Sequence, residues 1–227
     1  MKFTSALVTA ASGSIGGCVA ARNRHGLYLR ARAVPVNPQT AEQQGVRSKF
    51  ATLAATWVTT LSVDERTSWN TYADNVNVAP PFGNPTYLLG LNWYIACNAF
   101  REQLGLSRVT LAPSTFSLAS KTDVTVVADD SANTVTVAYN NGDQWATEVG
   151  GALGIYVGLP INASRSFFKG PYLFKDKVLG AVTPPTSPKV ISNIVISEGQ
   201  KIGVQVRACY ADGRISSTQR ILQLVVA

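Results

Sequence analysis

The sequence predicts an α+β chain in which an extended Gly/Arg-rich arm and a helical region precede an all-β sandwich. Three observations predict it. Basic residues are concentrated near the start, apolar residues then recur at helical spacing, and after Arg108 short Val, Ile, Thr and Tyr runs alternate with turn residues. The predicted boundaries are 1–36 for the arm, 37–107 for the helical domain and 108–227 for the sandwich. A chain of 227 residues is long enough for one large domain or two small ones.

The basic character of the chain belongs to its first 50 residues. They hold seven Lys or Arg residues and a single acidic residue, Glu42, and so account for +6 of the formal net charge of +7. A segment charged in this way is suited to a polyanion or to an acidic protein surface. The alternative is a solvated basic loop.

The predicted partner-binding residues of the arm are two arginine pairs and the tyrosine between them. Residues two apart in an extended chain share a face, so each pair would present both of its charges to one side. Leu27 and Leu29 would add apolar contacts on the face opposite the tyrosine. The five residues are Arg22, Arg24, Tyr28, Arg30 and Arg32.

Helical signals begin at Asn37-Pro38, where Asn is a good N-cap and Pro suits the first helical position. The apolar spacing that follows predicts a helix over 39–60 on one face, formed by Val46, Phe50, Leu53, Trp57 and Leu61.

A second helix is predicted over 63–77. Ser62 and Glu65 form a capping box that opens it, and we expect Trp57 and Trp69 to pack together across the turn. A Pro/Gly linker at 78–85 and a third helix over 86–104, ending at Gly105, complete the region. Its predicted core stripe is Leu88, Leu91, Ile95 and Ala99.

Seven strands without intervening helices are predicted in the remaining residues, and this pattern indicates a β-sandwich. Their ranges are 123–128, 133–139, 152–158, 172–178, 190–196, 202–210 and 219–226. Residues 202–216, IGVQVRACYADGRIS, resemble the F–G hairpin of fibronectin type III domains, with an alternating strand, an Asp-Gly turn and a returning strand. This resemblance implies a fibronectin III/Ig-like fold and implies no function.

A long loop at 158–171 carries the second predicted contact, formed by Phe167, Phe168 and Lys169. An aromatic, basic loop tip is typical of a binding surface. Packing of the two phenylalanines in the core is the alternative.

Residues that could carry chemistry are sparse, and we predict no enzyme, no cofactor, no metal site and no small-molecule substrate. Cys18, Cys97 and Cys209 are widely spaced and odd in number, and His25 is the single histidine. The run VTAASGSIG lacks the first two glycines of a dinucleotide-binding turn. No apolar run approaches the roughly 18 residues of a membrane span.

The first half of the chain resembles a group of small bacteriophage virion structural proteins. Their pattern joins a Gly-rich start, an Arg-rich extended segment, an Asn-Pro-x-Thr motif and a Trp-containing helix pair. It is carried here by residues within about 12–77: Gly13 to Gly17, Arg22 to Arg32, Asn37 to Thr40, Gln43, Gln44, Arg47, Phe50, Trp57, Arg66 and Trp69.

The resemblance implies a virion component made in the cytoplasm of a host bacterium. Its partners would be other virion proteins and copies of itself, in a homo-oligomer or lattice, with phage DNA as a further partner of the arm. A capsid accessory, cement or minor capsid protein is the first expectation, and a tail or connector protein is the second. The low charged fraction of 15%, against about 25% in ordinary domains, fits a surface covered in an assembly.

Three other functions stay open on the residues alone. Nucleic-acid binding would use the arm to neutralise phosphates. A glycan hydrolase would need paired carboxylates, for which Asp143 and Glu148 are candidates although both lie among turn residues. Carbohydrate binding by the sandwich is the remaining alternative.

Overall fold

The structure is a computed structural model that describes residues 13–23, 26–34, 36–78 and 86–226. The chain forms two compact units, Met1–Gly45 and Val46–Ala227. The fold is α+β, with helices and one large sheet in the second unit. None of the helices within the described ranges has both the length and the apolar character that crossing a membrane requires. The predicted boundaries 1–36, 37–107 and 108–227 stay predictions.

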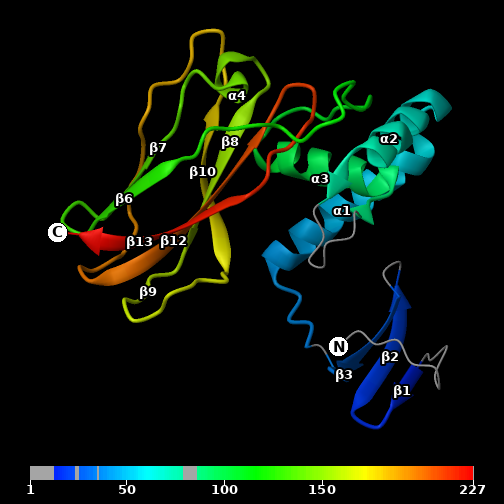
Figure 1. Ribbon diagram of the computed structural model, residues 1–227, viewed down its shortest axis with the longest axis horizontal. Helices are drawn as coiled ribbons and strands as arrows, with labels where there is room; N and C mark the ends of the chain where they lie inside the picture. The colour runs from blue at the N-terminus through cyan, green and yellow to red at the C-terminus, as the bar shows by residue number, and fades with distance from the viewer. Residues whose placement is uncertain (1–12, 24–25, 35, 79–85, 227) are drawn as a thin grey trace. The chain divides into compact units, whose positions relative to one another are not determined.

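The first unit contains a three-stranded antiparallel sheet, which corrects the prediction of a single extended arm. Strands β1 (Gly13–Ile15), β2 (Cys18–Asn23) and β3 (Gly26–Ala31) lie in the order β1-β2-β3 (Figure 1). The Gly-rich segment supplies the β1–β2 turn, where Gly16 has a φ of +56°, a conformation that other residues rarely adopt. The described residues of the arm therefore form β-strands, as an extended chain would, but these strands pair with one another through turns.

Helix α1 (Ala41–Thr59) begins later than the sequence predicts. The Thr40 hydroxyl accepts a hydrogen bond from the Gln43 amide at 3.3 Å, so Thr40 caps the helix. Gln39 has a φ of +49°, which interrupts the helical path that Asn37-Pro38 would have started.

Helix α2 (Val63–Asn75) confirms the predicted capping box. The Glu65 amide donates to the Ser62 hydroxyl at 3.2 Å, and the Ser62 amide donates to Glu65 Oε2 at 2.8 Å. Helix α3 (Gly90–Gln103) starts four residues after the predicted position, because strand β5 (Thr86–Tyr87) pairs with β4 (Asn77–Val78). A Cβ atom at Gly90 would collide with Asn70 of α2, so glycine permits the close approach of the two helices.

An aromatic cluster fills the core of the helices. Trp57 and Trp69 each pack against Tyr94, with ring centroids 5.6 Å away in both cases, rather than forming the predicted Trp–Trp contact. Tyr72 packs edge-on against Trp93 at 5.4 Å. The predicted stripe of α3 is only partly buried, because the large aromatic side chains occupy the core instead.

The β layer contains all seven predicted strands. They are β6 (Thr125–Asp129), β7 (Thr134–Ala138), β8 (Ala152–Gly158), β10 (Tyr172–Leu179), β11 (Lys189–Ile191), β12 (Gln200–Cys209) and β13 (Gln219–Val226). Strand β11 is shorter than the predicted 190–196, because Asn193 has a φ of +61° and ends the extended path. A two-residue strand, β9 (Ile161–Asn162), and a short helix, α4 (Gln144–Thr147), were not predicted.

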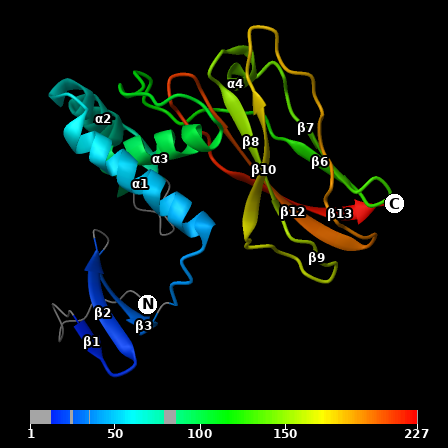
Figure 2. The same ribbon diagram turned by 180° about the vertical axis from the view of Figure 1, so that it is seen from behind.

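The strands follow the order β10-β8-β12-β13-β6-β7-β11, so that a short parallel contact between β13 and β6 joins two antiparallel groups (Figures 1 and 2). The two groups enclose one hydrophobic core, and the sandwich they form is nearly closed into a barrel. Strands β12 and β13 form the predicted hairpin.

Strands β8 and β12 are covered on both faces. Leu153, Ile155 and Val157 of β8 point into the sandwich core. The alternate residues of β8 face outward, where Ala152 joins the core of the helices. A Cβ atom at Gly154 would lie 3.1 Å from both Phe100 and Leu104, so glycine at this position lets α3 rest on the sheet.

Candidate interaction surfaces

Tyr28 and Arg30 share one face of the N-terminal sheet. Both belong to β3, where they pair with Ala21 and Val19 of β2, and residues two apart on a strand point to the same side. The Arg30 side chain is exposed and Tyr28 is half-buried. This is the part of the predicted basic site that the structure assembles.

Two of the other predicted arginines are described at other positions of this unit. Arg32 follows β3, is exposed, and its amide donates to the Gly17 carbonyl at 2.8 Å. The backbone of Arg22 belongs to β2 and pairs with Leu27. Arg24 lies outside the described residues. The described members of the predicted set are therefore distributed over a folded hairpin and its flank rather than along one extended chain.

The N-terminal sheet buries very little of itself. Among the described residues of this unit only Ala20, at 5% exposure, is buried, while Ile15, Val34 and Val36 are exposed. Independent stability of a small sheet needs a hydrophobic face on three or more strands, or a helix packed against them. The described strands of this sheet therefore bury little apolar surface among themselves.

The two phenylalanines of the loop 158–171 lie in different surroundings: Phe168 is packed against the sheet and Phe167 is exposed. Phe168 packs on the outward face of the sheet, where a Cβ atom at Gly158 or Gly203 would collide with its ring. Its ring also meets Tyr172 edge-on at 5.0 Å. Phe167, 68% exposed, and Lys169 face solvent. A contact through Phe167 and Lys169 therefore stays a prediction, and Phe168 anchors the loop.

A groove that the sequence analysis missed lies on the outward face of β8 and β12, beside α1 and α3. Its volume is about 370 Å³, and Val46, Lys49, Phe50, Ala96, Ala99, Phe100, Gln103, Tyr156, Gln205, Arg207 and Thr218 line it. These residues come from separate segments, so no local motif could reveal them. The one signal available was Arg207, a charged residue in a strand otherwise rich in small and apolar residues.

Polar groups in the groove are held in defined positions. The Tyr156 hydroxyl donates to Gln103 Oε1 at 2.7 Å, and burial raises the pKa of Tyr156 to about 12, so the phenol stays neutral. Arg207 Nε donates to the Ser216 carbonyl at 3.0 Å. The Arg207 guanidinium lies 5.5 Å from the centroid of the Phe100 ring.

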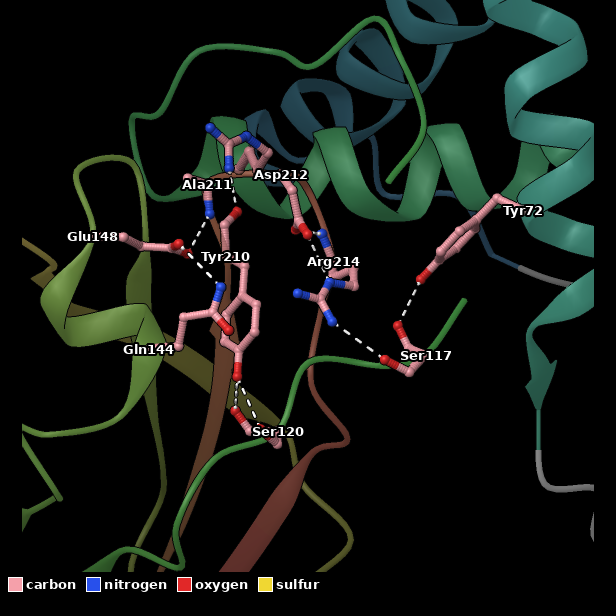
Figure 3. Close-up of polar contacts among 10 residues, drawn as sticks. Tyr72, Ser117, Ser120, Gln144, Glu148, Tyr210, Ala211, Asp212 and Arg214 are labelled. Carbon is pink, nitrogen blue, oxygen red and sulfur yellow. Dashed lines mark hydrogen bonds and ion pairs between the residues drawn. The ribbon is translucent and has the colours of Figure 1, made fainter. Parts of the chain in front are cut away.

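The acidic residues near the β12–β13 turn support the backbone (Figure 3). Glu148 Oε1 accepts from the Ala211 amide at 2.6 Å, and Asp212 pairs with Arg214 at 2.7 Å. The Tyr210 hydroxyl donates to the Ser120 carbonyl at 2.7 Å. The turn is thus fastened both to the loop after α4 and to the segment that enters the sandwich.

Asp143, the other candidate carboxylate, is also engaged. It accepts from the Thr122 amide at 2.8 Å, from the Thr122 hydroxyl at 2.7 Å and from Trp145 Nε1 at 3.2 Å. A carboxylate that accepts three hydrogen bonds fixes a loop, which is the turn role that its sequence context indicates.

Burial keeps two of the three thiols protonated. It raises the pKa of Cys97 to about 12 and that of Cys209 to about 11, and Cys18 is exposed. Within the described ranges, no three His, Cys, Asp or Glu side chains are grouped in a way that could hold a metal ion.

Comparison with known proteins adds little. No protein-family model matches the chain, and no curated protein matches it. Among solved structures, an Fn3-like protein from Clostridium thermocellum is similar, with 16% sequence identity and a TM-score of 0.31. The match covers 48% of this chain and 95% of that chain.

Proposed function

We propose that this chain is a structural component of a bacteriophage virion, namely a capsid accessory, cement or minor capsid protein. It docks through its N-terminal unit and its helices. A tail or connector protein is the alternative within the same class. The protein is made in the cytoplasm of the host bacterium and is then incorporated into particles beside other virion proteins and copies of itself.

The observation that carries this proposal is the coreless N-terminal sheet. With Ala20 as its one buried residue in the described part, the sheet gains little from its own packing. A partner surface that covers one face would supply the missing layer. The exposed Arg30 and Arg32 would direct the sheet to an acidic surface.

Helix α1 extends the same argument. Val46 and Phe50 belong to the same apolar stripe of α1 as Leu53. They are 54% and 50% exposed, however, whereas Leu53 is fully buried. The predicted helical face is therefore covered by the chain itself only over its second half. A neighbouring subunit would cover the first half.

The sandwich supports a role in projection or bridging. We propose that it is fibronectin III-like, since β6-β7-β11 form one antiparallel group and β10-β8-β12-β13 form the other. It is a rigid support on which the exposed Phe167 and Lys169 are displayed.

The test is density-gradient sedimentation of lysate from the native source, with quantitative mass spectrometry of the particle band. On the order of hundreds of copies per particle would support a cement or accessory protein. A few to a few dozen would support a connector or tail part. Protein found only at the top of the gradient would contradict the virion proposal.

Nucleic-acid binding is a second candidate, favoured by the shared face of Tyr28 and Arg30. An arginine and an aromatic ring side by side suit a phosphate and a stacked base. Binding to single-stranded DNA should then weaken steeply as salt rises, and Arg30→Gln should reduce it. Arg165→Gln, which changes an exposed arginine of the sandwich, is the matched control. A salt-independent signal would exclude this candidate.

A further inference from the structure

The groove beside Arg207 has the size and the walls of a small-molecule site. Its volume of about 370 Å³ lies in the range of small-ligand pockets, roughly 300–1,000 Å³. Aromatic rings from three elements form its walls, namely Phe50 of α1, Phe100 of α3 and Tyr156 of β8. Such rings stack on flat apolar groups.

The charge of the groove has one sign. Its charged lining residues are Lys49 and Arg207, and no carboxylate lines it. The ion pairs found in the described part of the chain involve other residues. The groove is therefore electrostatically complementary to an anion.

Arg207 retains donors that the described chain does not use. Nε donates to Ser216, but neither terminal nitrogen donates to a described residue. Phe100 covers the guanidinium on one side. Arg207 is half-buried, and a partly desolvated guanidinium without a carboxylate partner carries a desolvation cost, which an incoming anion would offset through a charge-assisted, two-point contact.

We propose that this groove binds a small organic anion in which a carboxylate or sulfonate is joined to an aromatic body. The anionic group meets the terminal nitrogens of Arg207, with Lys49 as the second cation. The aromatic body lies among Phe50, Phe100 and Tyr156. No residue of the N-terminal sheet takes part in the groove, but Val46 and Phe50 of α1 line it, so the bound anion would occupy part of the helical face that a neighbouring subunit would otherwise cover.

The test compares two probes that share the aromatic body and differ at one polar group, the anionic 4-(trifluoromethyl)benzoate and the neutral 4-(trifluoromethyl)benzamide, by fluorine NMR titration against the full chain. We expect the benzoate to bind roughly tenfold or more tighter than the amide, because a charge-assisted hydrogen bond contributes about 1.5–3 kcal/mol. Equal affinity of the two probes would overturn the proposal. Failure of the benzoate to bind while a short acidic peptide binds would overturn it in favour of a protein-docking site.

Two variants locate the binding. Arg207→Met should remove the preference for the benzoate, while Arg165→Met, the same change at an exposed site outside the groove, should leave it intact. Because Arg207→Met could unfold the chain, circular dichroism is recorded first. Lys49→Met alters an exposed helix position and should weaken the benzoate several-fold without affecting the fold. Wild-type preference retained in both groove variants would refute the assignment.

Discussion

Arg101 is the one charged side chain buried in the described part of the chain, at 4% exposure. Its Nε donates to the Ser107 carbonyl at 2.8 Å, and Nη1 donates to the carbonyls of Tyr210 at 2.7 Å and Gly150 at 3.2 Å. One residue of α3 thus satisfies backbone acceptors in three segments, two of which belong to the sandwich.

Arg101→Met should lower the free energy of unfolding by about 2–4 kcal/mol, because it leaves buried carbonyls without donors. Urea denaturation of the purified chain measures the loss. Arg108→Met, which removes a partly exposed partner of Glu102, should cost less than about 1 kcal/mol. Equal losses in the two variants would mean that the buried contacts of Arg101 contribute no more than a surface pair.

A second prediction concerns Phe168 and the two glycines that its ring contacts, Gly158 and Gly203. Gly158→Ala should displace the Phe168 ring and destabilise the chain by about 1–3 kcal/mol, since the added methyl group occupies the position of the ring. In the Gly158→Ala, Phe168→Ala double variant the loss should fall below the sum of the single losses, because the collision is gone.

The matched control is Gly45→Ala in α1, where an added methyl group meets nothing within 4 Å. That variant should be neutral or more stable by about 0.5–1 kcal/mol, through helix propensity alone. Thermal melting of the wild type and the four variants (Gly158→Ala, Phe168→Ala, the double variant and Gly45→Ala) decides the prediction. Additive losses in the double variant would show that the glycines do not make room for Phe168.

At the scale of elements, periodicity and capping chemistry located most of the fold. The Ser62–Glu65 box marked the start of α2, and the alternating runs located all seven main strands. Local signals failed where longer-range contacts decided the outcome. Asn37-Pro38 is a good helix-start signal, but the helix begins after Thr40, which caps it. Residues 86–87 pair with residues 77–78 and so do not form the first turn of α3.

The capping box of Ser62 and Glu65 predicts that the stability of the chain depends on pH. The hydrogen bond from the Ser62 amide is the main reason that the pKa of Glu65 lies below its ordinary value. A depressed carboxyl pKa contributes stability that is present above the unfolded pKa and is lost as the pH falls through the folded pKa. Wild type should therefore lose stability relative to Glu65→Gln on acidification below about pH 4.

Glutamine keeps an acceptor for the Ser62 amide but does not titrate, so this variant isolates the effect of the charge. The measurement is the difference in denaturation midpoint between the two proteins at successive pH values. A difference that is constant from neutral to acidic pH would contradict the assignment of the depressed pKa to Glu65.

At the scale of the whole molecule, composition predicted two interaction surfaces, which stay predictions, and it did not predict the groove. The charge imbalance of the first 50 residues pointed to the arm, and the loop pattern pointed to Phe167, Phe168 and Lys169. The predicted residues of the arm are Arg22, Arg24, Tyr28, Arg30 and Arg32. The groove around Arg207 forms where α1 and α3 pack beside strands β8 and β12. The periodicity of a single sequence does not show which helices pack against which strands. Phe168 also needed the structure, because its role depends on glycines in other strands.

Deletion of residues 1–36 should leave a folded protein that no longer joins particles. The aromatic cluster, the sandwich core and α1 all lie beyond residue 36, so the truncated chain keeps every buried residue of the described ranges other than Ala20. Circular dichroism tests the folding, and particle sedimentation after complementation tests the incorporation. Normal incorporation of the truncated chain would refute a docking role for the N-terminal unit.

Strands β8 and β12 serve two cores at once, one on each face. Unfolding of the helices would expose the apolar residues on one face of these strands, and opening of the sandwich would expose those on the other face. The helical and β parts should therefore lose structure in a single calorimetric event, with equal van't Hoff and measured enthalpies. A protease that cuts near residue 108 should accordingly yield two nicked but associated fragments, and neither half should survive as a domain released from the other.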